Sequence, residues 1–173
     1  MTQPDSGARR RLLPEGIDQV QIYHRQDVLR NDIERCRAEA WEAIEFDASG
    51  WGDGEQLHDD LTRKLNLPTY YGRNLDALAD VSRQLPFGET GFTAEAAGGL
   101  LVFHHYDGFM AAKKGRATAV LDIFVTASNW SLQHGWPLAC LVQSDDPQLV
   151  IGPVAATVIA WNRAERTPAS RGL

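Results

Sequence analysis

The sequence predicts an α/β fold in which helices pack against a parallel sheet. Between residues 41 and 142, short apolar runs typical of buried strands alternate with segments whose apolar residues recur at helical spacing. The order is strand, helix, helix, strand, helix, strand, and strands separated by helices usually lie parallel. A chain of 173 residues with a hydrophobic fraction of 43% is long and apolar enough for one domain with a hydrophobic core, together with extensions.

The first part of the chain is predicted to change from a mobile start to regular structure. Residues 1–15 are polar and basic, and we expect them to be mobile. The apolar run at 20–23 indicates a short strand, and residues 27–40 indicate a helix with Asp27 as its N-cap. Residues 41–47 predict the next strand.

Two leucine-rich stripes predict a pair of helices in the middle of the chain. Leucines recur every four residues over 57–65, and Pro68 ends this helix. After a short turn, Asn74 can cap a second helix over residues 75–85, which stops before Pro86.

The second half of the chain continues the alternation. After a loop at 86–99, the run at 99–103 predicts a buried strand, residues 111–134 a helix and residues 137–142 another buried strand. The apolar segment at 154–161 fits either a strand or a helix.

The charge balance favours some partners over others. The net charge of -6 and the pI of about 5.3 argue against nucleic-acid binding and suit a basic protein partner, although solubility alone also explains an acidic surface. No run is long enough for a membrane helix, and Arg9–Arg11 lack the apolar core of a signal peptide. Cys36 and Cys140 form no metal-binding pair, so we expect a reduced, cytoplasmic protein.

The most informative run extends from Leu67 to Asp80 and reads Leu-Pro-Thr-Tyr-Tyr-Gly-Arg-Asn-Leu-Asp-Ala-Leu-Ala-Asp. Asp76 and Asp80 are four residues apart, so they project from one helix face. Because like charges at this spacing cost about 0.2–0.5 kcal/mol in an isolated helix, a chain that keeps them can use them for binding. The alternative is a solvated face on which Arg73 and Arg83 form ordinary weak ion pairs with these acids.

This run resembles the central motif of the barstar family, small acidic proteins that inhibit a secreted ribonuclease. The resemblance covers roughly residues 41–145 and implies a three-stranded parallel sheet packed with helices. Residues 1–40 then form an N-terminal extension and residues 146–173 a C-terminal extension. Either extension can cover a sheet edge or form a dimer contact.

The resemblance also implies a binding site, since in this family the second helix and the turn before it block the ribonuclease active site. The residues at matching positions are Tyr70, Gly72, Asn74, Asp76 and Asp80. By this interpretation Asp80 takes the place of an RNA phosphate, Asp76 is a second anchor and Tyr70 supplies a flat aromatic contact.

Four residues depart from the family pattern. Ala79 replaces a tryptophan, Arg73 an acid, Arg83 a small polar residue and Thr126 a glutamate. Together they remove negative charge and an aromatic contact and add positive charge. The departures leave open whether inhibition of a ribonuclease is retained.

Other chemistry-bearing residues are expected to be structural. His104 and His105 are strand neighbours that point to opposite faces and so are unsuited to chelate one metal. Asp107–Gly108 is interpreted as a turn, and Trp130 and Trp136 as core residues near a helix end.

The sequence therefore predicts a binding protein and not an enzyme, since no catalytic constellation, cofactor motif or metal-ligand pattern is present. The expected partner is a basic protein, an extracellular-type ribonuclease or a related toxin, with no nucleic acid or membrane involved. The alternative is a protein-interaction module on the same fold whose partner is not a ribonuclease.

Overall fold

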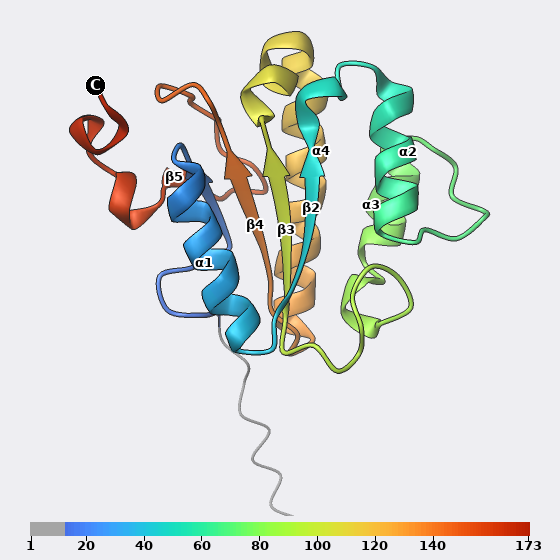
Figure 1. The fold of residues 1–173 in the computed structure, drawn as a ribbon. Coiled ribbons are helices and arrows are strands. Elements are labelled where there is room, and N and C mark those ends of the chain that lie inside the picture. The colour runs from blue at the N-terminus through green and yellow to red at the C-terminus, as the bar shows by residue number, and fades with distance from the viewer. Residues whose placement is uncertain (1–12) are drawn as a thin grey trace, which may run out of the picture.

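The structure is a computed structural model that describes residues 13–173. Its centre is a five-stranded sheet with the order β2-β3-β4-β1-β5, in which all neighbouring strands are parallel (Figure 1). The strands are β1 (Val20–Tyr23), β2 (Glu42–Asp47), β3 (Gly99–His104), β4 (Leu138–Gln143) and β5 (Ala160–Trp161).

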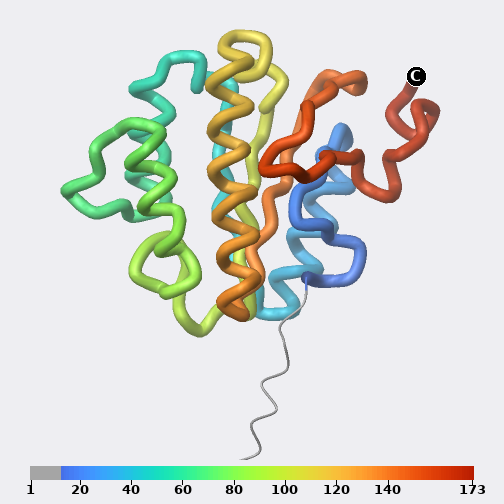
Figure 2. The backbone as a smooth tube through the Cα atoms, turned by 180° about the vertical axis from the view of Figure 1, so that it is seen from behind, coloured from blue at the N-terminus to red at the C-terminus, as the bar shows by residue number. Residues whose placement is uncertain are grey.

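Helices cover both faces of this sheet. They are α1 (Gln26–Ala38), α2 (Gly54–Lys64), α3 (Leu75–Ser82) and α4 (Tyr106–Gln133). Alternate residues of β3 show the two faces, because Leu100 and Val102 belong to the core under α1, whereas Leu101 and Phe103 belong to the core shared with the other three helices. Figures 1 and 2 show α1 on one side of the sheet and the long α4 on the other.

The α/β class is confirmed, but the expected number of three strands is wrong. β1 pairs with β4 through the register Val20↔Cys140, and β5 pairs with β1 through Gln21↔Ala160. All four residues of β1 are buried, so the short strand indicated at residues 20–23 is confirmed and lies within the sheet. The family resemblance covers only residues 41–145, so the three strands that it implies do not include β1 or β5.

Two helix starts also differ from the sequence prediction. α1 begins at Gln26 with Arg25 as its N-cap, so Asp27 lies in the first turn. α4 begins at Tyr106 and not at residue 111, with a kink at Lys113, so Asp107 and Gly108 are helical and do not form a turn. The early start has a physical reason, since the added turns bury Tyr106 and Phe109 completely.

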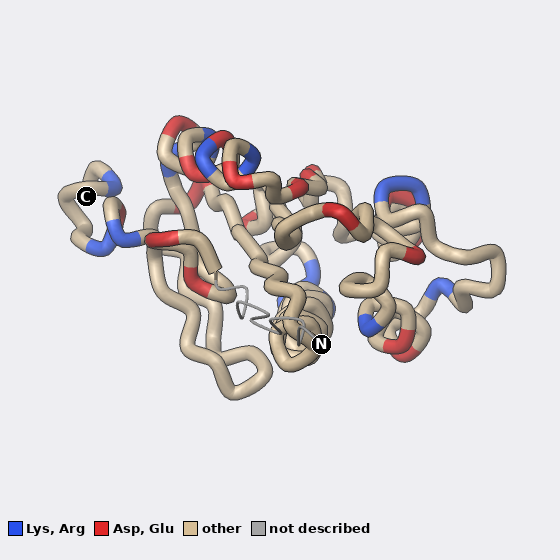
Figure 3. The backbone as a smooth tube through the Cα atoms, turned by 90° about the horizontal axis from the view of Figure 1, so that it is seen from below, with Lys and Arg blue, Asp and Glu red and all other residues tan. Residues whose placement is uncertain are grey.

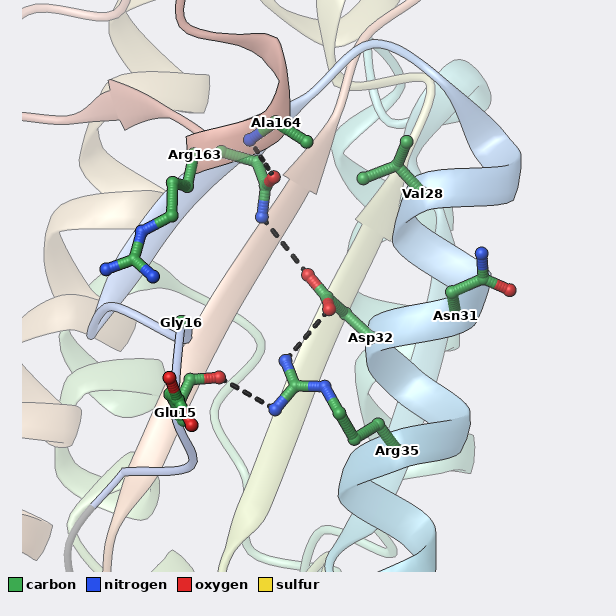
Figure 4. Close-up of a pocket in the computed structure, with 9 residues that line it drawn as sticks. Glu15, Gly16, Val28, Asn31, Asp32, Arg35, Arg163 and Ala164 are labelled. Carbon is green, nitrogen blue, oxygen red and sulfur yellow. Dashed lines mark hydrogen bonds and ion pairs between the residues drawn. The ribbon is translucent and has the colours of Figure 1, made fainter.

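Polar contacts tie both ends of the described chain to α1 (Figure 4). Asp32 accepts hydrogen bonds from Arg35 at 2.9 Å and from Asn162 at 3.1 Å, while Arg35 donates to the carbonyl of Glu15 at 2.7 Å. Glu165, which is fully buried, accepts the backbone N–H of Arg25, the N-cap of α1, at 2.8 Å. Of these residues, Glu15, Asp32, Arg35 and Asn162 line a cavity of about 550 Å³ between α1 and the C-terminal segment.

Two further observations concern the cysteines and the character of the helices. Both cysteines are buried and unpaired, and burial raises the pKa of the Cys140 thiol to about 12, as suits an inert core residue. Across residues 13–173, none of the helices combines the length and apolar character that a membrane crossing needs. The expected mobility of the N-terminus falls mainly on residues 1–12, which lie outside the described residues.

Candidate protein-binding surface

The short helix α3 is held rigidly at its start and along its inner side. Asn74 is its N-cap, as the sequence predicted, and its Oδ1 accepts the backbone N–H of Ala77 at 2.8 Å. Leu78 is fully buried and Val81 is 4% exposed. Because the cap and the core contacts both fix the backbone, side chains on the outer side of α3 project from fixed positions.

Asp76 and Asp80 project from the outer side of α3 into solvent. The Asp80 side chain is 79% exposed, and its nearest cation is Arg83, with an Nη1–Oδ1 distance of 3.9 Å. Asp76 is also exposed and forms no ion pair with any residue in the described part of the chain. Arg73, which could have paired with Asp76, instead contacts Asp59 at 2.8 Å. Both carboxylates are therefore available to a partner.

The turn before α3 separates its two tyrosines. Tyr70 is 73% exposed, whereas Tyr71 is buried and its hydroxyl lies 2.6 Å from Nδ1 of His58 on α2. Burial raises the pKa of Tyr71 to about 12. A Cβ on Gly72 would lie 3.3 Å from the Asn74 amide, so a side chain there would crowd the cap of α3. Anchored by Tyr71, the turn presents Tyr70 outward beside the start of α3.

His58 also lines a cleft beside the start of α2. His58 is half-buried, and its pKa is lowered mainly by this burial and to a smaller extent by the charges of Arg73 and Arg116. Arg116 reaches from α4 toward Gly54, the first residue of α2, at one side of a cleft of about 530 Å³ that also borders Asn74. Sequence spacing could not have revealed this cleft because its walls come from separate elements.

A second groove lies between α3 and α4, which pack side by side (Figure 2). Its volume is about 440 Å³, and its lining residues are Arg83, Thr126, Asn129, Trp130 and Gln133.

The aromatic side of this groove corrects one expectation. Trp136 is buried as expected, but Trp130 is 38% exposed and is not a core residue. Its ring lies 4.1 Å from that of His134, which in turn contacts the exposed ring of Phe87 at 5.8 Å. These three rings form a partly exposed cluster at the C-terminal end of α4.

The neighbouring histidines at the end of β3 have separate acidic partners. His104 Nε2 lies 2.8 Å from Glu45, and His105 Nδ1 lies 2.8 Å from Asp145. Within residues 13–173, no three or more His, Cys, Asp or Glu side chains are arranged to hold a metal ion.

Comparison with known proteins relates the central part of the chain to a family. Residues 41–143 match the family model described as Barstar (barnase inhibitor). This chain belongs to the barstar family. The match runs from just before β2 to the end of β4, so it includes the turn, α3 and the groove-lining part of α4, and it excludes β1, α1 and β5.

A named relative supports the same membership. The Bacillus subtilis (strain 168) protein named "Putative ribonuclease inhibitor YrdF" is 57% identical to this chain over 37 residues. That alignment covers 21% of this chain and 41% of the relative, so the similarity spans less than half of the relative's length.

Proposed function

We propose that this protein is a non-catalytic inhibitor that binds a ribonuclease and occludes its phosphate site with α3 and the turn before it. The names of the family and of the Bacillus subtilis relative support an inhibitor of a ribonuclease. The observation that carries the mechanism is the exposure of Asp76 and Asp80 on the outer side of a rigid helix.

The chemistry of a ribonuclease pocket explains why carboxylates suit this role. Such a pocket holds the RNA phosphate with cationic side chains, and a carboxylate can accept the same charge-assisted hydrogen bonds. Asn74 and the buried Leu78 fix α3, so its backbone loses little conformational entropy when Asp80 enters the pocket. Tyr70, with its ring largely exposed, adds an apolar contact at the edge of the site.

Long-range electrostatics support a basic partner. The net charge of -6 accelerates the encounter with a positively charged protein. Figure 3 shows acidic and basic residues close together around the fold, without one face of a single sign in that view. We therefore expect a weaker salt dependence of association than a uniformly acidic surface would give.

The second candidate is an interaction module whose partner is not a ribonuclease. Arg73 and Arg83 favour it, because they place two cations beside the acids of α3. A co-purification from native cells separates the two functions, since the first requires a basic nuclease in the complex.

A direct test measures inhibition of barnase and of other basic ribonucleases in a fluorogenic RNA-cleavage assay. Asp80→Asn should weaken binding about 30-fold or more, the loss typical of an interface hot spot, with little change in thermal stability. Glu39→Gln is the matched control, because Glu39 is also exposed and caps the end of α1 on the opposite face of the sheet. Unchanged affinity of Asp80→Asn for a ribonuclease that the wild type inhibits would place the inhibitory surface elsewhere.

A further inference from the structure

The groove beside Asp80 carries a cation where an acidic binding surface would continue. Of its five lining residues, Arg83 is the charged one. The Arg83 side chain is 59% exposed, and its ion pair with Asp80 spans 3.9 Å, which leaves most of its donors to solvent. Arg83 is also the C-cap of α3, where the helix dipole stabilises a cation. The surface therefore changes sign within one turn of α3.

A partner that covers Asp80 must also cover Arg83. A protein interface of standard size buries about 800 Å² on each partner, far more than these two neighbouring side chains occupy. Inside such an interface Arg83 loses water, and a desolvated cation is costly unless it is paired. Asp80 is a poor pair for it, because under the proposed function its carboxylate faces the phosphate pocket of the partner.

The aromatic wall of the groove adds to this requirement. Trp130 presents a partly exposed indole in the same groove as Arg83, and its ring contacts that of His134. A flat indole beside a guanidinium suits a partner rim that carries an acidic side chain with apolar neighbours.

We propose that Arg83 determines which ribonuclease this protein accepts. It pairs with a carboxylate at the rim of the partner's phosphate pocket, and it disfavours ribonucleases whose rim is cationic throughout. This inference rests on the proposed function, and it names a selectivity residue that lies outside the acidic pair.

The test uses barnase as the probe, because the description of the matched family model names it as the inhibited protein. Since a pocket that holds RNA phosphates needs cationic side chains, it should accept a carboxylate at position 83 more readily than Arg83. Arg83→Glu should lower the dissociation constant for barnase by about ten-fold or more at 0.1 M salt, and Arg83→Gln should give an intermediate value. The gain should shrink at 1 M salt, where the screening length falls to about 3 Å.

Arg63→Glu is the matched control. Arg63 is exposed, pairs with Asp60 at the same three-residue spacing and lies on α2 outside the groove. Its reversal should change the barnase affinity less than about two-fold. Thermal melts of all variants check that each remains folded.

Every outcome decides between the alternatives. If the wild type does not inhibit barnase measurably, a gain in Arg83→Glu supports selection by Arg83, and no gain overturns it. Unchanged or weaker binding of Arg83→Glu, in a wild type that does inhibit, also overturns it. Asp80→Asn is measured in the same assay, and it is combined with Arg83→Glu if only Arg83→Glu binds barnase. If Asp80→Asn weakens binding while the Arg83 variants bind like the wild type, the proposed function is kept and only the selectivity is rejected.

Discussion

Asp32 and Asn162 are 130 residues apart in the sequence, yet the Asn162 amide donates a hydrogen bond of 3.1 Å to the Asp32 carboxylate. The same oxygen accepts the hydroxyl of Tyr23, which is fully buried on β1, at 2.8 Å. One carboxylate therefore joins α1, β1 and the C-terminal segment on the face of the sheet opposite α3.

Asp32→Ala should destabilise the protein by about 2–3 kcal/mol, because it leaves the buried Tyr23 hydroxyl and the Asn162 amide without their acceptor. Urea denaturation measures this loss. Asn31→Ala changes the exposed neighbour on the same helix and should cost less than about 0.5 kcal/mol. Equal losses in the two variants would contradict the bridging role of Asp32.

Asn74→Ala should cost about 1 kcal/mol of folding stability, because the first turn of α3 loses its side-chain cap. Asn74→Ser can still cap and should recover most of that loss. Thermal or urea melts give the stabilities, and ribonuclease inhibition is measured beside them. If Asn74 acts only through the cap, Asn74→Ser should inhibit nearly as well as the wild type, whereas a lost inhibitor with a normal melt would indicate a direct contact.

The pair formed by His105 and Asp145 should make stability depend on pH. The hydrogen bond to Asp145, aided by the charges of Asp145, Asp47 and Asp107, raises the pKa of His105. Hydrogen bonds from Gln143 and His105 lower the pKa of Asp145. The contribution of His105 is complete below about pH 6.5 and is lost as the pH rises through its folded pKa, and that of Asp145 is complete above about pH 4 and is lost on acidification.

Asp145→Asn should therefore reduce stability most between about pH 4.5 and 6, and the difference from the wild type should shrink above pH 7. Since both side chains are more than a third exposed, we expect about 0.5 kcal/mol after screening. NMR titration of the His105 ring gives a second readout, because its pKa should fall in the variant. A stability difference that stays constant from pH 5 to pH 8 would exclude a charge-dependent pair.

Local features of the candidate site could be predicted from the sequence. The cap by Asn74 and the four-residue spacing of Asp76 and Asp80 follow from short-range rules, and the structure has both the cap and the exposed acids. The start of α4 could not be predicted, because Tyr106 and Phe109 become helical to fill a core formed by distant residues. The contact between His58 and Tyr71 could not be predicted for the same reason, since the two residues come from separate elements.

The sequence by itself determined the α/β class, the element order between residues 41 and 142, and the motif that relates this chain to the barstar family. Each of these depends on spacing along the chain, which hydrophobic periodicity and caps record directly. Only the tertiary structure decided that β1 lies between β4 and β5, that Arg73 turns to Asp59, and that Arg83 shares a groove with Trp130. These relationships join residues far apart in the chain, and packing of the whole core selects them, so no local pattern specifies them in advance.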